Sequence, residues 1–249
     1  GDPTDPGDWI TAAEDAGTDS TGGFFLGCVD PAPGGQAANS LWHGTHVAGT
    51  IGALSNNGAG VAGVNWNSKI LPVRVSGKCG GYLSDIADGM RWAAGLSVSG
   101  VPANANPAKV MNLSLGGPGA CGSTYQTAID AITAAGATVV VAAGNEAVDV
   151  VNSRPANCNG VISVAATTRT GAKALYSNFG TGIKIAAPGG SGGNDVLSTL
   201  NTGATGPVAS PGGDTYVAYQ GTSMAAPHVS GVVALMLSVN SSLSPTQVL

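Results

Sequence analysis

The sequence has 249 residues, of which 9% are charged, and its formal net charge at pH 7 is -5. This length suffices for one large domain with its own core, and the scarcity of Lys and Arg argues against binding nucleic acid through phosphate neutralisation. No run of 18 residues is apolar enough to predict a membrane span, because the best apolar stretches contain Gly, Ser or Pro.

The acidic residues are unevenly placed. Seven of the 14 lie in the first 30 positions, whereas the first basic residue is Lys69. One interpretation is a solvated acidic face. The other is a calcium-binding loop, because Asp2, Asp5 and Asp8 recur among Pro and Gly turns, although their spacing is not that of an EF-hand.

After an irregular first 40 residues, two periodicities alternate along the chain. Apolar residues at helical spacing, or with a plausible cap, predict helices at residues 46–54, 83–96, 123–136 and 223–239. Short apolar or β-branched runs predict strands at residues 69–75, 108–115, 137–145, 160–167, 182–189 and 215–220, with a surface loop at 190–213.

This alternation predicts an α/β fold in which helices cover both faces of a largely parallel sheet. There is no internal repeat and no linker long enough to separate two domains. We therefore expect one domain over residues 1–249.

All three histidines fall in two short motifs. His43 and His46 lie in "HGTHVAGT", and His228 lies in "GTSMAAPHV" together with Ser223. Asn145 closes "AAGN" at the end of a predicted buried strand, where a side chain can face a cleft. Each residue has an ordinary interpretation: a buried histidine, a Gly-Asn turn, or a serine that caps a helix.

Three other motif interpretations fail on context. The histidine pair lacks the glutamate of HExxH, so we expect no zinc site. "GAGVAG" at residues 58–63 follows a predicted helix and leads into a strand, the reverse of a dinucleotide-binding loop. "GTSMA" is similar to a nucleophile elbow, but in that hydrolase fold the acid and then the histidine follow the serine. Here the only histidine after Ser223 is His228, five residues on and in the same predicted helix.

The joint order of the motifs is more specific than any one of them. "HGTHVAGT", "AAGN" and "GTSMAAPHV", together with "NLSLGG", "YSNFG" and "AAPGG", resemble the subtilisin-like serine proteases over about residues 40 to 240. The resemblance implies a three-layer α/β fold and a serine endopeptidase acting on proteins or peptides, with no cofactor for catalysis.

The resemblance also assigns roles to individual residues. It implies Ser223 as nucleophile, His43 as general base and Asn145 as an oxyanion-hole amide. Substrate would pair with Ser114, Leu115 and Gly116, and the pocket wall would be formed by Ala142, Ala143 and Gly144.

One expected motif is missing. The family carries its catalytic aspartate upstream of the histidine in Asp-Thr-Gly or Asp-Ser-Gly, and neither occurs in this sequence. We expect a chain truncated at both ends, its first strand lying before Gly1 and its last helix cut at Leu249. The alternative is a catalytically inactive peptide-binding protein of the same fold.

The four cysteines form no CxxC pair, so they predict two disulfides in a secreted protein, with three possible connectivities. The resemblance implies the pairs Cys28–Cys79 and Cys121–Cys158. It also makes structural calcium at Asp2, Asp5 and Asp8 a stronger expectation. We further expect an extracellular monomer without nucleic-acid or membrane partners.

Overall fold

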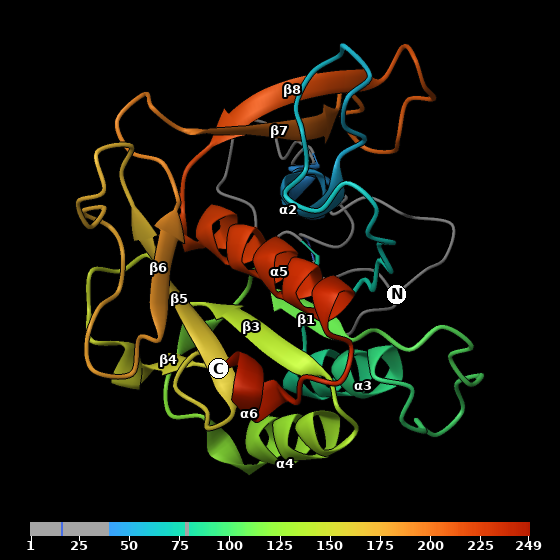
Figure 1. Ribbon diagram of the computed structural model, residues 1–249, viewed down its shortest axis with the longest axis vertical. Coiled ribbons are helices and arrows are strands. Elements are labelled where there is room, and N and C mark those ends of the chain that lie inside the picture. The colour runs from blue at the N-terminus through green and yellow to red at the C-terminus, as the bar shows by residue number, and fades with distance from the viewer. Residues whose placement is uncertain (1–15, 17–39, 78–79) are drawn as a thin grey trace.

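The computed structural model describes residue 16 and residues 40–77 and 80–249. The predictions for Asp2, Asp5, Asp8, Cys28 and Cys79 lie outside the described residues. The core of the described part is a parallel sheet in the order β1-β3-β5-β6 (Figure 1). Its strands are β1 (Val110–Leu113), β3 (Thr138–Ala142), β5 (Val161–Thr167) and β6 (Ile185–Pro188).

Helices cover both faces of this sheet. They are α3 (Leu83–Ala93), α4 (Gly122–Ala134) and α5 (Thr222–Val239), followed by the short α6 (Pro245–Val248). Helix α2 (His43–Gly52) packs against α5 and β7 instead. Helix α5 runs across one face, and α3 and α4 lie against the other (Figure 1). The mainly parallel, helix-covered α/β architecture predicted from the sequence is therefore confirmed.

Strand β3 shows how the sequence produces these layers. All five of its residues are buried, and their side chains alternate between the two faces of the sheet. Val139 and Val141 pack into the cluster formed with α3 and α4, whereas Val140 and Ala142 pack against α5. A strand covered on both sides needs the continuous apolar run "TVVVA" instead of an alternating pattern.

Contrary to the expectation from the sequence, one stretch of 18 residues is apolar enough to cross a membrane by length and composition: helix α5, with a mean hydropathy of 1.4. Half of it is buried inside the protein, and it contacts β1, β3, β5 and β6. Helix α5 is therefore a core helix, and this explains why its sequence is apolar nearly all round.

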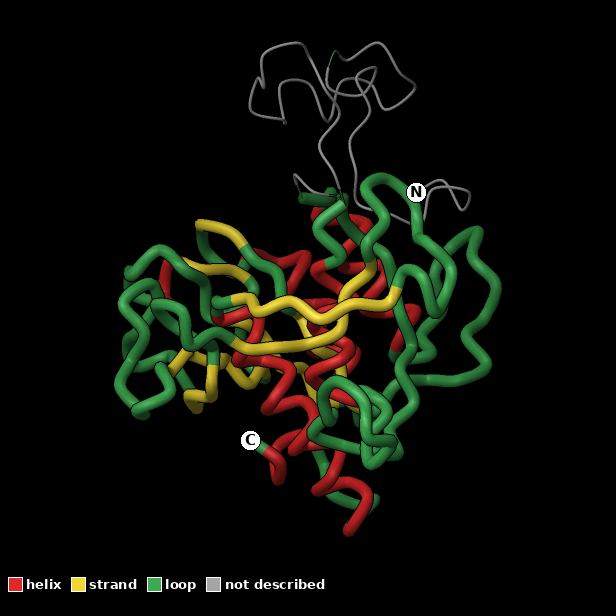
Figure 2. Tube along the Cα trace, turned by 90° about the horizontal axis from the view of Figure 1, so that it is seen from above, coloured by secondary structure: helices red, strands yellow, loops and turns green. Residues whose placement is uncertain are grey.

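Two small antiparallel pairs lie outside the main sheet. One joins β2 (Gly117–Pro118) to β4 (Ser153–Arg154), which follows a 3-10 turn, η1, at Val150–Asn152. The other joins β7 (Val196–Asn201) to β8 (Asp214–Tyr219), whose strands run side by side in Figure 2.

Two sequence predictions about strands are wrong. Residues 190–213 are not one surface loop, because Val196–Asn201 form β7 and pair with β8 over six residues. The Gly-, Ser- and Asn-rich flanks obscured this strand. Residues 69–75 are not assigned to a strand, and Pro72 within them has no N–H to donate to a ladder.

A disulfide joins Cys121 to Cys158, one of the two pairs that the family resemblance implies. Cys121 immediately precedes α4, and Cys158 lies in the turn before β5. The bridge closes a loop over 37 positions of sequence. It fastens the start of a covering helix to the sheet that the helix covers.

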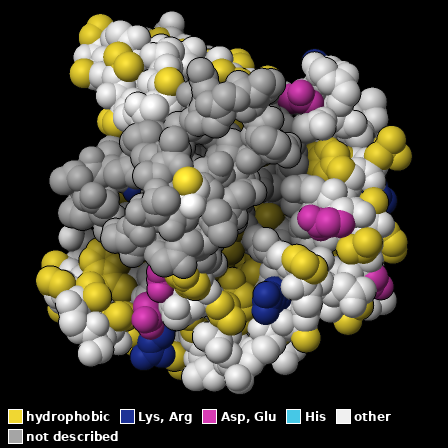
Figure 3. Space-filling view, turned by 180° about the vertical axis from the view of Figure 1, so that it is seen from behind, with side chains coloured by type: hydrophobic (Ala, Val, Ile, Leu, Met, Phe, Trp, Pro, Cys, Tyr) yellow, Lys and Arg dark blue, Asp and Glu magenta, His cyan; other side chains and the backbone are white. Residues whose placement is uncertain are grey.

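Charged side chains are sparse on the surface. On the face shown in Figure 3, the Lys and Arg side chains of the described residues lie singly and form no continuous patch. This agrees with a sequence in which only 9% of the residues carry a charge.

His46 fastens α2 to the β7–β8 pair. Its Nε2 lies 3.1 Å from the Val196 carbonyl oxygen and 2.9 Å from that of Val217, and its ring stacks on Tyr219. Carbonyl oxygens only accept hydrogen bonds, so Nε2 carries the proton. Nδ1 is buried without a partner. Burial lowers the pKa of His46 below its ordinary value of 6.5, outweighing the two backbone hydrogen bonds.

We predict that the free energy of unfolding decreases as the pH falls below about 6.5. The unfolded chain then binds a proton at His46 that the folded protein does not, at a cost of up to about 1.4 kcal/mol per pH unit. Denaturant unfolding at pH 7.5 and 5 measures this slope. His46→Phe keeps an aromatic ring but cannot titrate, so it should be less stable at pH 7.5 and show a shallower slope. Equal slopes in the two proteins would contradict the assignment.

Candidate active site

Ser223 is the second residue of α5, and the helix is preceded by a glycine whose backbone conformation side-chain-bearing residues rarely adopt. Gly221 has φ 150° and precedes the helix, and its N–H donates to the carbonyl oxygen of Gly189 (2.9 Å). The N–H groups of a first helical turn have no partner within the helix, and the dipole makes this end positive. The hydroxyl of Ser223 donates to the Ser114 carbonyl oxygen at 3.3 Å.

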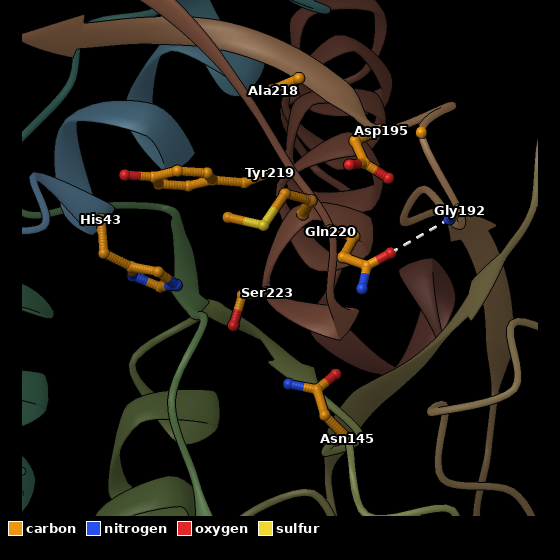
Figure 4. Close-up of a pocket in the computed structure, with 10 residues that line it drawn as sticks. His43, Asn145, Gly192, Asp195, Ala218, Tyr219, Gln220 and Ser223 are labelled. Carbon is orange, nitrogen blue, oxygen red and sulfur yellow. Dashed lines mark hydrogen bonds between the residues drawn. The ribbon is translucent and has the colours of Figure 1, made fainter.

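Asn145 follows β3, and α5 orients its side chain. The N–H and the hydroxyl of Thr222 both donate to Asn145 Oδ1, at 2.8 and 3.0 Å. The Thr222 hydroxyl oxygen in turn accepts from the N–H of Gly144 at 3.1 Å. With Oδ1 occupied, the amide nitrogen of Asn145 points toward Ser223 (Figure 4).

The side-chain amide of Asn145 and the backbone N–H of Ser223 lie near one small space beside Gly221. A Cβ atom built at Gly221 would lie 3.6 Å from both Nδ2 and Oδ1 of Asn145 and 3.7 Å from the backbone nitrogen of Ser223. This space stays open because residue 221 has no side chain.

His43 is the first residue of α2, after Trp42 in the left-handed conformation (φ 51°). The Trp42 indole N–H donates to the Gly203 carbonyl oxygen at 2.7 Å, and the Tyr219 hydroxyl donates to the Leu41 carbonyl oxygen at 2.9 Å. These bonds fix the start of α2 against the loops of the β7–β8 pair. The His43 imidazole points toward Ser223 (Figure 4).

The three residues line one pocket of about 640 Å³, although 102 and 78 positions of sequence separate them. The described residues that line it are His43, Asn145, Gly192, Gly193, Asp195, Ala218, Tyr219, Gln220, Ser223 and Met224. The sequence motifs therefore meet in space. His46 takes no part in the pocket, because it is fully buried under the β7–β8 pair.

The residues predicted to contact substrate lie beside this pocket. Ser114 to Gly116 continue β1 beyond Leu113, and the Ser114 hydroxyl donates to the Ser223 carbonyl oxygen at 2.7 Å. Ala142 and Ala143 are buried at the end of β3, and Gly144 is half-exposed. Their contact with substrate stays a prediction.

Sequence reasoning missed the residue that holds the Asn145 segment. Asn178 is fully buried, and its Oδ1 accepts from the N–H groups of Glu146 (3.1 Å) and Val148 (3.0 Å). Its Nδ2 donates to the Ala143 carbonyl oxygen at 2.9 Å and to the Glu146 carboxylate at 2.8 Å. The signal was present in "YSNFG", where a polar pair lies between two aromatic residues.

The described residues contain no group of three or more His, Cys, Asp or Glu side chains that could hold a metal ion. The calcium prediction concerned Asp2, Asp5 and Asp8, which the structure does not describe.

A family model described as "Subtilase family" matches residues 25–249. The chain belongs to the subtilase family. Among curated proteins, the subtilase chain is 57% identical over 235 residues to the extracellular protease of Xanthomonas campestris pv. campestris, which covers 93% of this chain and 39% of that protein. It is 49% identical over 244 residues to the extracellular basic protease of Dichelobacter nodosus, covering 98% of this chain and 37% of that protein.

Two solved structures of proteases are also similar to this chain. A protease from Pseudoalteromonas arctica superposes on the subtilase chain with a TM-score of 0.84 at 50% identity, covering 98% of this chain and 67% of that one. A cold-adapted subtilisin-like serine proteinase gives 0.65 at 33% identity, covering 83% and 64%. The chain spans about two fifths of the length of the two curated relatives described above.

We predict that Asn178→Ala lowers the free energy of unfolding by about 3 kcal/mol, because it removes the partners of the buried Ala143 carbonyl oxygen and of the N–H groups of Glu146 and Val148. Urea denaturation measures the change. Asn67→Ala, at an exposed asparagine, is the matched control and should shift stability by less than about 0.5 kcal/mol. Similar losses in the two variants would show that the Asn178 network does not hold the segment.

Proposed function

We propose that the protein is a serine endopeptidase that cleaves peptide bonds through an acyl-enzyme on Ser223. The observation that carries this proposal is the meeting of His43, Asn145 and Ser223 in one pocket from three distant parts of the chain. Membership of the subtilase family and the protease names of the relatives support it.

In the first step, Ser223 Oγ attacks the carbonyl carbon of the peptide bond while His43 takes the hydroxyl proton. The tetrahedral intermediate then collapses, and the C–N bond breaks as His43 returns the proton to the leaving amine. Water, activated by the same imidazole, hydrolyses the ester on Ser223 and releases the acid. The carboxylate that orients His43 is not assigned to any residue of this chain.

The negative oxygen of the tetrahedral intermediate would lie in the space beside Gly221. Asn145 Nδ2 and the backbone N–H of Ser223 flank this space. Both donors are fixed before substrate binds, Asn145 by Thr222 and Ser223 by the helix, so little reorganisation accompanies charge development. The positive end of α5 adds to the stabilisation.

A substrate would cross Ser223 in an extended conformation. Residues before the scissile bond would pair with the backbone of Ser114 to Gly116, as a strand added beside the end of β1. Residues after it would then enter the 640 Å³ pocket that Tyr219, Gln220 and Met224 help to line.

Several finer features of the protein remain proposals. The names of the relatives and the Cys121–Cys158 bridge support an extracellular protein. We also propose a single peptidase domain over residues 1–249 that acts as a monomer, without nucleic-acid or membrane partners. The Cys28–Cys79 bridge and calcium at Asp2, Asp5 and Asp8 belong to the same proposal.

We predict that a fluorophosphonate labels the naturally produced protein at Ser223 and that Ser223→Ala abolishes both labelling and peptide hydrolysis. Asn145→Ala should still be labelled, but with kcat lowered on the order of 10²–10³-fold and KM little changed. This magnitude is the one known from a subtilisin, a member of the same family. Mass spectrometry locates the label.

Asn67→Ala is the control, and it should retain full kcat. An intact protein that is neither labelled at Ser223 nor able to cleave peptides would contradict the proposed function and leave a peptide-binding protein as the interpretation.

A further inference from the structure

Ser223, the proposed nucleophile, has a carbonyl oxygen to which its own helix offers no regular donor. In an α-helix this oxygen accepts from the N–H group four residues later. That residue is Pro227, which lies inside α5 and has no N–H group. A donor from outside the helix takes its place, because the Ser114 hydroxyl lies 2.7 Å from the Ser223 carbonyl oxygen. Ser114 directly follows β1, which packs against α5.

A chain of polar side chains leads from α5 through β1 to this hydroxyl. Asn112 lies in β1, and its Nδ2 is 2.9 Å from Ser114 Oγ. Its Oδ1 is 2.9 Å from the hydroxyl oxygen of Ser230, a buried residue of α5. Asn112 is level with Val140, which packs into the apolar cluster beneath α5. An amide on that face of the sheet costs free energy unless it is hydrogen-bonded, and both of these bonds connect it to α5 or to Ser114.

The direction of each bond follows from the last acceptor of the chain. A carbonyl oxygen only accepts, so the Ser114 hydroxyl donates its single proton to Ser223. The Ser114 oxygen must then accept from Asn112, which places the amide nitrogen toward Ser114 and the amide oxygen toward Ser230. An amide supplies the required donor and acceptor together, whereas a carboxylate of the same shape has only acceptors.

We propose that Asn112 is a positioning residue, which directs the Ser114 hydroxyl onto the Ser223 carbonyl oxygen and so fixes the nucleophile. This inference rests on the proposed function. The Ser223 hydroxyl donates in turn to the Ser114 carbonyl oxygen at 3.3 Å, so two bonds join the start of α5 to the segment that would hold the substrate. These bonds set the distance from Oγ to the scissile carbonyl carbon, and a displacement of about 1 Å can lower a rate on the order of 10²-fold.

The variant that tests the direction of the bonds is Asn112→Asp, which keeps the shape of the side chain. At about pH 8 its carboxyl group is ionised, so both of its oxygens accept and the Ser114 hydroxyl turns its proton away from Ser223. We expect kcat to fall about tenfold, as for the loss of one hydrogen bond. KM should change little, because the backbone of Ser114 to Gly116 remains. Ser114→Ala, which removes the hydroxyl, should lower kcat by a similar factor.

The double variant separates positioning from a general structural role. If Asn112 acts through the Ser114 hydroxyl, Asn112→Asp should cause no further loss of kcat in the Ser114→Ala background, whereas a general distortion of β1 would add its own loss. Titration of Ser223 with a fluorophosphonate gives the concentration of intact sites in each variant.

Ser238→Ala is the matched control. It removes an exposed hydroxyl that donates to the Leu235 carbonyl oxygen at 2.7 Å, near the other end of α5, and it should retain full kcat.

The outcomes distinguish the inference from the proposed function. An unchanged kcat in Asn112→Asp overturns the inference, and so do additive losses in the double variant or a loss confined to KM. If the naturally produced protein is neither labelled at Ser223 nor able to cleave peptides, the proposed function itself fails, and the inference fails with it.

Discussion

The contact between Thr222 and Asn145 is the one on which the site depends. Thr222 is fully buried, and both of its donors bind the same oxygen of an amide 77 positions earlier in the chain. The contact joins the end of β3 to the start of α5. Because Asn145 Oδ1 is bound from two directions, the amide cannot rotate without losing two hydrogen bonds. Its nitrogen is therefore presented to the pocket beside Ser223.

This contact requires α5 to approach the sheet closely, and small residues make that possible. Ala225 and Ala226 are fully buried in the cluster that includes Val140 and Val164 of the sheet. Larger side chains at these two positions would push the helix away from the strands and separate Thr222 from Asn145. The packing that stabilises the core thus also sets the distance between Ser223 and the amide of Asn145.

Much of this architecture could be predicted from the sequence, because each element has a clear period. The continuous apolar run of β3 and the helical spacing in α3 and α4 depend only on local residues, and the structure confirms them. Strand β7 was missed because its partner, β8, lies after a turn of Gly, Ser and Pro. Pairing across such a turn is a property of two segments, and neither one shows it alone.

In the site, too, residues in local motifs could be predicted, whereas contacts between distant segments could not. His43, Asn145 and Ser223 were identified because each lies in its own glycine-flanked motif. The role of Asn178 could not be identified in this way, since its bonds to Ala143, Glu146 and Val148 cross 30 to 35 positions. Asp195 carries no motif at all. Only the folded turn before β7 shows that its buried Oδ1 has no hydrogen-bond partner among the described residues.

The two histidines of "HGTHVAGT" show how a single helix serves both packing and chemistry. Residues three apart share one side of a helix, yet His46 is fully buried whereas His43 reaches the pocket. The difference arises along the axis of α2, because its first turn extends beyond the β7–β8 pair that covers His46. Since Tyr219 stacks on His46 and also lines the pocket, β8 fixes the start of α2 and one wall of the pocket together. A displacement of the β7–β8 pair would therefore move His43 and the Tyr219 wall of the pocket as one unit relative to Ser223.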